Sequence, residues 1–76
     1  MSVSKRVVEY HIARLSDKNP DVRLKAIREL ELIGDPDALE ALQALFENDV
    51  NVDVRKAAQA AGRAIYKKQR EEREGS

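Results

Sequence analysis

The pentapeptide NPDVR at residues 19–23 returns as NVDVR at residues 51–55, thirty-two positions later. Each copy opens a stretch that contains alanine and aliphatic residues at helical spacing. A fixed internal period of this length is typical of folds in which one helical unit stacks on the next. Such units usually present binding surfaces and seldom carry out chemistry alone. The repeat therefore predicts a stack of helices.

Apolar residues recur with a period near 3.6 along most of the chain, which predicts four helices. We expect them over about residues 4–16, 20–33, 36–47 and 52–70, within a single domain over residues 1–70. The charged segment 71–76 is expected to prolong the last helix to about residue 73 and to fray at its end. Short loops make successive helices antiparallel, so the predicted fold is an all-α, four-helix, right-handed α–α superhelix of two hairpins.

Residues with strong positional preferences mark the helix ends. Ser4, Asn19 and Asp35 are predicted N-caps, and the last two are each followed by proline, which is favoured at the first helical position. Gly34 is predicted to end the second helix in the left-handed conformation. The predicted core residues of the four helices are Val7, Val8, His11, Ile12 and Leu15; Val22, Ala26, Ile27, Leu30 and Ile33; Ala38, Leu39, Ala41, Leu42, Leu45 and Phe46; and Val54, Ala57, Ala58, Ala61, Gly62 and Ile65.

Composition limits the class of protein. With 76 residues the chain buries only about 60% of its unfolded surface, so a partner, self-association or a tight cap is expected to add stability. There is no cysteine, which excludes disulfides and thiolate ligands. The first residues contain no long apolar run, so neither a signal peptide nor a membrane span is predicted, and we expect a cytoplasmic protein.

Three of these motifs resemble those of a known repeat family. The segment LSDKNPDVRLKA at residues 15–26, IGDPDAL at 33–39 and DVRKAA at 53–58 resembles HEAT repeats, most closely the HEAT-like class found in phycobilisome (bilin) lyases. The resemblance implies that the Asp and Arg of each motif tie adjacent repeats together. These structural inter-repeat residues are Asp21, Arg23, Asp53 and Arg55. By analogy alone, it also implies a weaker alternative function in bilin attachment or removal.

No catalytic constellation is found, and we expect a protein that is not an enzyme and carries no cofactor. His11 is the only histidine and lies in an apolar stripe, where a core role is favoured over a metal ligand. Asp35 and Asp37 flank Pro36, and their first role is to start the third helix, so no metal site is predicted there. The serines lie at termini and helix ends without a base beside them.

A row on the second helix suggests a binding surface instead. Leu24, Arg28 and Leu32 stand four residues apart opposite the core stripe, and apolar anchors beside an arginine are favoured at interface centres. On the fourth helix Lys56, Arg63 and Lys67 form a basic row. If the two helices lie side by side, these rows make one face that suits an acidic or amphipathic segment of another protein.

The leading hypothesis is thus a protein-interaction module, an adaptor or accessory subunit of a larger assembly, with a homodimer as an open alternative. Nucleic acid is the competing ligand for the basic row. The zero net charge, from fourteen basic and fourteen acidic residues, argues against it. The charges are segregated, however, since residues 35–49 carry five acids and no base, while residues 50–70 carry six bases and one acid.

Overall fold

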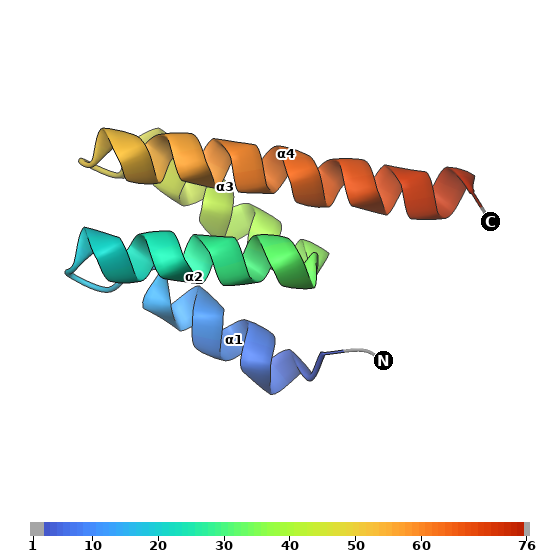
Figure 1. Cartoon of the computed structure of the whole chain (residues 1–76), viewed down its shortest axis with the longest axis horizontal. Helices are drawn as coiled ribbons and strands as arrows, with labels where there is room; N and C mark the ends of the chain where they lie inside the picture. The colour runs from blue at the N-terminus through green and yellow to red at the C-terminus, as the bar shows by residue number, and fades with distance from the viewer. Residues whose placement is uncertain (1–2, 76) are drawn as a thin grey trace.

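The structure, a computed structural model, describes residues 3–75. It contains four α-helices and one short 3-10 helix, and no strand occurs within that range (Figure 1). The elements are α1 (Lys5–Arg14), α2 (Pro20–Ile33), η1 (Pro36–Ala38), α3 (Leu39–Asn48) and α4 (Val52–Glu74). The prediction of an all-helical fold is confirmed.

The helices pack as two hairpins that lie against each other. α1 packs on α2 and α3 packs on α4, and α2 and α4 lie side by side across the junction (Figure 1). The loops α1–α2 and α3–α4 lie at the same end of the molecule. This arrangement places the two copies of the repeated pentapeptide at equivalent corners of neighbouring hairpins.

The helix starts are held by side chains that accept hydrogen bonds from backbone N–H groups. Ser4 Oγ accepts from the N–H of Arg6 at 3.1 Å, and Asn19 Oδ1 accepts from that of Asp21 at 2.9 Å. Asp35 Oδ1 accepts from the N–H of Asp37 at 2.8 Å. Because the first turn of a helix has no internal partners for these donors, each cap stabilises its helix. The three predicted N-caps are confirmed.

Gly34 ends α2 in the left-handed conformation, with φ of 75°, as its position after the apolar stripe predicts. A second constraint acts there as well. A Cβ atom at this position would lie 2.8 Å from the Nζ atom of Lys68, so the side chain of Lys68 passes directly over the end of α2. Gly34 is therefore required by its backbone conformation, and the end of the flexible Lys68 side chain would have to move to make room for a Cβ atom.

Three helix boundaries differ from the expected ones. α1 ends at Arg14, two residues early, and Leu15 caps it while its side chain stays buried. The third helix begins with the 3-10 turn η1 before the α-helical part starts at Leu39. α4 continues through Glu74, one residue past its expected end near residue 73. Ser76, which was expected to fray, lies outside the described residues.

The core lies between the two hairpins and follows the predicted stripes with one exception. The buried residues are Val8, Leu15, Ala26, Ile27, Leu30, Ala38, Leu42, Val54, Ala58, Ala61 and Ile65. Val7 was predicted to be in the core but is 41% exposed, so that expectation was wrong. The reason is geometric. Val7 and Val8 differ by 100° around α1, and only Val8 is on the side of α1 that faces the core.

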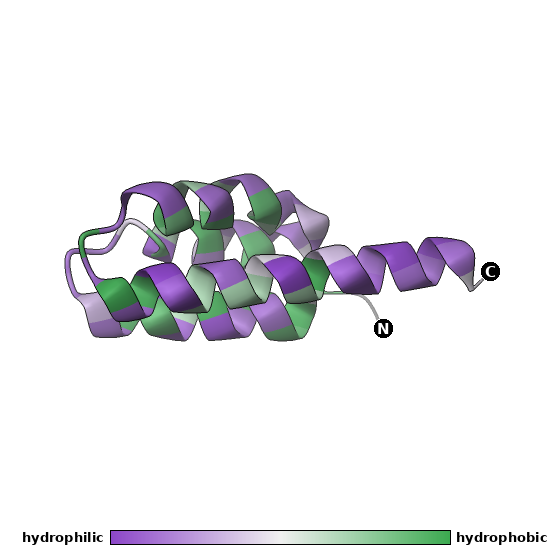
Figure 2. Ribbon diagram, turned by 90° about the horizontal axis from the view of Figure 1, so that it is seen from above, coloured by the Kyte–Doolittle hydropathy of each residue, from purple (hydrophilic) through white to green (hydrophobic). Residues whose placement is uncertain are grey.

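α4 extends well beyond the core. Its 23 residues span about 34 Å, whereas the 14 residues of α2 span about 21 Å at the usual rise per residue. The projecting end is hydrophilic, as Figure 2 shows by its colour. Charged residues and good helix formers keep this segment helical without an apolar partner.

Candidate functional site

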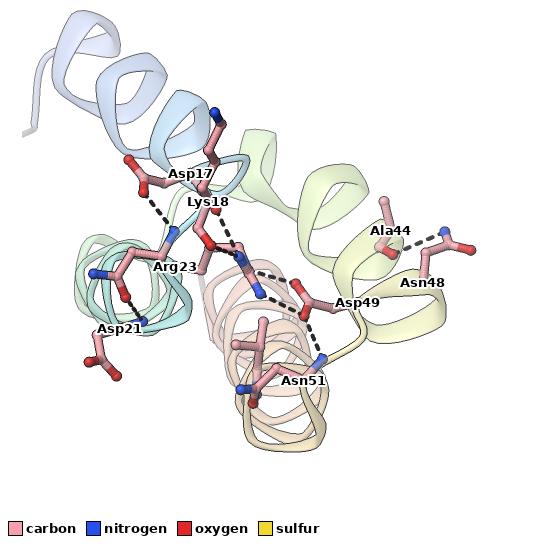
Figure 3. Close-up of polar contacts among 10 residues, drawn as sticks. Asp17, Lys18, Asp21, Arg23, Ala44, Asn48, Asp49 and Asn51 are labelled. Carbon is pink, nitrogen blue, oxygen red and sulfur yellow. Dashed lines mark hydrogen bonds and ion pairs between the residues drawn. The ribbon is translucent and has the colours of Figure 1, made fainter.

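Arg23 is the main polar link between the hairpins. Its Nη1 atom donates to the backbone carbonyls of Asp17 at 2.8 Å and Lys18 at 3.1 Å, in the loop before α2 (Figure 3). Its Nη2 atom donates to Asp49 Oδ1 at 3.0 Å, and its Nε atom lies 2.8 Å from Asp49 Oδ2. The Nε contact is an ion pair whose N–H direction falls outside hydrogen-bond geometry.

This ion pair is largely shielded from water, because the side chains of Arg23 and Asp49 are 12% and 5% exposed. Asp49 lies in the loop before α4, so the pair joins the first hairpin to the second. A guanidinium group suits this position because its planar fork can contact two carboxylate oxygens and two carbonyls together. The arrangement is architectural, since every polar group of Arg23 is directed at its own chain.

Arg55, the second copy of Arg23, is in a different environment. Its side chain is exposed, and its Nε atom donates to the carbonyl of Phe46 at 3.1 Å. Within residues 3–75 it forms no ion pair. Asp21 and Asp53 are also exposed and unpaired within that range. The structure thus brings together Arg23 and Asp49, and it does not bring the repeated Asp residues of the pentapeptide to either arginine.

Sequence reasoning missed Asp49, although a signal for it exists. Asp17 and Asp49 each stand two residues before the N-cap asparagine, so the repeat extends two positions further towards the N-terminus. Both carboxylates play the same local part. Asp17 Oδ1 accepts from the N–H of Asn19, and Asp49 Oδ1 accepts from that of Asn51, each at 2.9 Å.

A family model described as HEAT repeats matches residues 3–62, from α1 to the middle of α4. The chain belongs to the HEAT-repeat family. The resemblance seen in the motifs is thereby confirmed at the level of the family. The match is to HEAT repeats in general, so a role in bilin chemistry stays a prediction of the resemblance alone. No curated protein and no solved structure matches the chain.

HEAT repeats generally mediate protein–protein interactions and are generally non-catalytic. The candidate site of this HEAT-repeat chain is therefore an exposed surface, and the geometry of its faces matters more than any single side chain. No helix within the described part of the chain has the length and apolar character that crossing a membrane requires.

The predicted row on α2 is only partly exposed. Leu32 is 78% exposed and Arg28 is also exposed, as expected. Leu24, in contrast, is half-buried and packs against the core, so its expected exposure was wrong. Leu24 lies on a flank of α2 that packs against the core, and 3.6-residue spacing alone does not reveal which flank of a helix is covered. The exposed part of this row is Arg28 and Leu32.

The basic row on α4 is exposed throughout, but its members border different surfaces. Lys56 and Arg63 line hollows that α4 shares with α3, whereas Lys67 lines one along the projecting end of α4. None of the three forms an ion pair among the described residues. The basic row and the α2 row are on neighbouring helices, yet none of these hollows is lined by a residue of α2.

A hollow lies between α3 and α4 on the side away from the first hairpin. It has a volume of about 490 Å³, and its apolar lining includes Leu39, Phe46 and Tyr66. A second hollow, of about 280 Å³, adjoins it through Phe46 and Gln59. This side of the second hairpin therefore carries a partly apolar groove with Glu40 on the α3 wall and Arg63 on the α4 wall.

Asp35 and Asp37 do not form an open carboxylate pair. Lys5 Nζ on α1 lies 2.7 Å from Asp35 Oδ2 and 2.9 Å from Asp37 Oδ2. The hydrogen bond from Lys5, helped by the N–H of Asp37, lowers the pKa of Asp35 below its ordinary value. The same contacts, first with Asp35 and then with Asp37, raise the pKa of Lys5. The cluster ties the start of α1 to the corner before α3.

His11 has a packing role. Its ring meets that of Tyr10 edge to face, with centroids 5.2 Å apart and an interplanar angle of 72°. Its Nδ1 atom is buried without a hydrogen-bond partner, although the residue as a whole is half-buried. In residues 3–75 no three His, Asp or Glu side chains gather closely enough to hold a metal ion.

Proposed function

We propose that this HEAT-repeat chain is a non-catalytic protein-binding module, an adaptor or accessory subunit that holds an acidic or amphipathic segment of another protein. The observation that carries the proposal is Leu32, a large apolar side chain 78% exposed on α2 and flanked by Arg28 one turn earlier. An exposed apolar side chain next to an arginine provides the two kinds of contact that interface centres favour.

The basic row on α4 supports the acidic part of that description. α4 lies beside α2, and Lys67 is exposed and forms no ion pair within the described residues. A partner carboxylate gains most from a cation that has no internal partner, because no existing contact must first be broken. Leu32, Arg28 and Lys67 are the residues on which we expect partner affinity to depend most.

The experiment is quantitative affinity capture from the native lysate with wild-type chain and two single variants. Leu32→Ser and Lys67→Glu should each reduce the yield of the same co-purifying proteins, with helicity by circular dichroism unchanged. Val50→Ser is the matched control, because Val50 is 95% exposed but lies in the loop before α4 at the other end of the molecule. Leu24→Ser is unsuitable, since Leu24 packs against the core.

Equal capture by wild type and both variants would remove this face from consideration. Loss of capture with Val50→Ser as well would mean that the assay measures non-specific binding to exposed apolar side chains. The proposal requires that the two face variants lose partners which the control retains.

Nucleic acid is the second candidate ligand, favoured by three exposed cations on one helix that form no ion pair with the residues described: Lys56, Arg63 and Lys67. The acids at the end of α4 and the zero net charge weigh against it. Retention on DNA or RNA at low salt, lost steeply as salt rises and abolished when the three cations are changed to glutamate, would support this ligand. Absence of retention at low salt would reject it.

A further inference from the structure

Among the described residues, the repeated motif forms one complete Arg–Asp link between hairpins and leaves the two separate halves of a second. The complete link is Arg23 with Asp49. Arg55 is the later copy of Arg23, and Asp17 is the earlier copy of Asp49, each displaced by the same thirty-two positions. Neither Arg55 nor Asp17 has an ion-pair partner among the residues that the structure describes. An arginine is thus unpaired on the second hairpin, and an aspartate is unpaired on the first.

Asp17 is already in the local setting that Asp49 has in the complete link, whereas Arg55 shares only the helical position of Arg23. Asp17 Oδ1 is oriented by the N–H of Asn19 at the same distance, 2.9 Å, at which Asp49 is oriented by Asn51. Arg55 begins from the same position in the first turn of its helix as Arg23, and its side chain is exposed. Because Asp17 is already oriented, its side chain needs no reordering for an Arg55–Asp17 contact between two chains, which limits the entropic cost.

We propose that a second copy of this chain stacks head to tail on the α3–α4 side, in the relation that the second hairpin has to the first. Arg55 of one copy then pairs with Asp17 of the next copy, just as Arg23 pairs with Asp49 within the chain. The proposal concerns the two ends of the stack of hairpins and does not depend on the α2 and α4 row described above.

Apolar surface at both ends fits this stacking. The α3–α4 side carries the groove lined by Leu39, Phe46 and Tyr66. The opposite end of the molecule exposes two large apolar side chains on α1, with Val7 41% and Tyr10 57% exposed. Head-to-tail contact covers both surfaces together, and burial of apolar area is the main favourable term in association.

The charges at the two ends are also complementary. The wall of the groove formed by α3 carries Glu40, and Glu47 lies two turns further along the same exposed side. At the other end Arg14 and Lys25 line a hollow of about 190 Å³ beside Tyr10. Arg63 on the α4 wall of the groove and Glu29 beside Lys25 give each end charges of both signs, so acids and bases of one copy can pair with those of the next. A two-fold dimer through either end would leave Arg55 and Asp17 unpaired, so the interface is heterologous and produces chains or rings of copies.

The test is sedimentation equilibrium of the full chain at low salt, over the widest concentration range that its solubility allows. The weight-average mass of wild type should rise with concentration past twice the chain mass of 8.6 kDa without a plateau there. Arg55→Glu and Asp17→Arg should each lower the association constant about tenfold or more, because each places like charges across the interface. An equimolar mixture of the two variants should recover association, since the opposite charges are then restored at every contact.

Three controls separate this contact from general effects. Asp17→Asn keeps the oxygen that accepts from Asn19 and removes only the charge, so it should weaken association while the helices stay intact. Lys67→Glu makes the same change of charge as Arg55→Glu on another side of α4 and should leave the mass unchanged. Leu32→Ser, which tests the proposed function, should also leave it unchanged.

Several results would overturn the proposal. One is a wild-type mass that stays at a single chain throughout. Another is a plateau at two chains that Arg55→Glu does not shift, which would indicate a two-fold dimer. A third is an equal effect of Lys67→Glu, and a fourth is a mixture of the two variants that stays unassociated although both are folded by circular dichroism.

Discussion

Arg23 and Asp49 are 26 residues apart in sequence and meet through two guanidinium nitrogens and both carboxylate oxygens, almost out of contact with water. The same arginine also binds two carbonyls of the loop before its own helix. One side chain therefore connects two loops and two hairpins. In a domain whose total stability is expected to be about 4–11 kcal/mol, removal of one partner from such a contact should cost a large fraction of the whole.

Removing the charge of Asp49 should destabilise the fold strongly. Asp49→Asn keeps an oxygen for the N–H of Asn51 but leaves Arg23 as a shielded cation without a counter-charge, at a cost of about 3 kcal/mol. Asp17→Asn, the same change at the equivalent exposed position, should cost less than about 0.5 kcal/mol. Urea denaturation at low protein concentration measures both. Similar midpoints for the two variants would contradict the role given to Arg23 and Asp49.

Arg23→Ala and Arg55→Ala should differ in the same way. Arg23→Ala removes an ion pair and two hydrogen bonds to loop carbonyls, and we expect a loss of about 3 kcal/mol or more. Arg55→Ala removes one exposed hydrogen bond, to the carbonyl of Phe46, and should cost less than about 1 kcal/mol. Thermal unfolding by circular dichroism compares them at one concentration, low enough to keep the chains monomeric. A larger loss of stability from Arg55→Ala than from Arg23→Ala would contradict the structural role given to Arg23.

Stability from the Lys5 cluster should depend on pH at both extremes. The pKa of Asp35 is lowered in the folded state, so its contribution is present above the ordinary value of 3.8 and is lost as pH falls through the folded pKa. The pKa of Lys5 is raised, so its contribution is present below 10.5 and is lost as pH rises through the folded pKa. The difference in Tm between wild type and Lys5→Ala should therefore become smaller at both low and high pH.

Because this cluster is exposed, its effect should also fall in high salt. Arg6→Ala is the control, since Arg6 is its exposed neighbour and forms no ion pair within the described residues. A Tm difference for Lys5→Ala that stays constant across the pH range would show that packing, and not charge, is responsible.

Replacement of the α2 end glycine should be unfavourable. Gly34→Ala places a Cβ in a backbone conformation with φ of 75° and 2.8 Å from Lys68 Nζ. The left-handed conformation alone costs about 1 kcal/mol for alanine. The side chain of Lys68 is flexible and can withdraw, so the backbone term should dominate. Gly34→Ala in a Lys68→Ala background should lose nearly as much stability as in wild type, which urea denaturation can verify.

A glycine-to-alanine substitution within α4 should instead stabilise the fold. Gly62 lies in the interior of a 23-residue helix, and a Cβ there would meet no atom within 4 Å. Alanine is favoured over glycine at such positions by about 1 kcal/mol, because it reduces the freedom of the unfolded chain. Gly62→Ala should therefore raise the Tm while Gly34→Ala lowers it. A destabilising Gly62→Ala would mean that the groove between α3 and α4 closes on this position.

Much of the fold could be predicted because the relevant interactions are local. Asn19 and Asp35 cap helices by binding N–H groups two residues away, and Gly34 adopts a conformation that depends on its own lack of a side chain. Such signals act within one turn and are present in the chain before any packing. The 3-10 turn after Asp35 was missed because it differs from α-helix by one hydrogen-bond step.

The candidate surface could be predicted less well. Leu24 and Leu32 occupy comparable positions in the helical pattern, yet one packs against the core and the other is 78% exposed. Val7 and Val8 are adjacent in the sequence, yet Val7 is exposed and Val8 is buried. Periodicity shows that a helix has an apolar side, but the width of surface that is covered depends on the angle and distance of the neighbouring helix.

The sequence by itself determined that this chain is a stack of capped helices with a thirty-two-residue period, because caps, breaks and apolar stripes arise from contacts within a few residues. Tertiary structure alone decided that Arg23 has a partner while Arg55 has none, although the two stand in the same pentapeptide. The physical reason is that an ion pair needs a carboxylate in reach, and only the first of the two hairpins has a loop carrying Asp49 packed beside it.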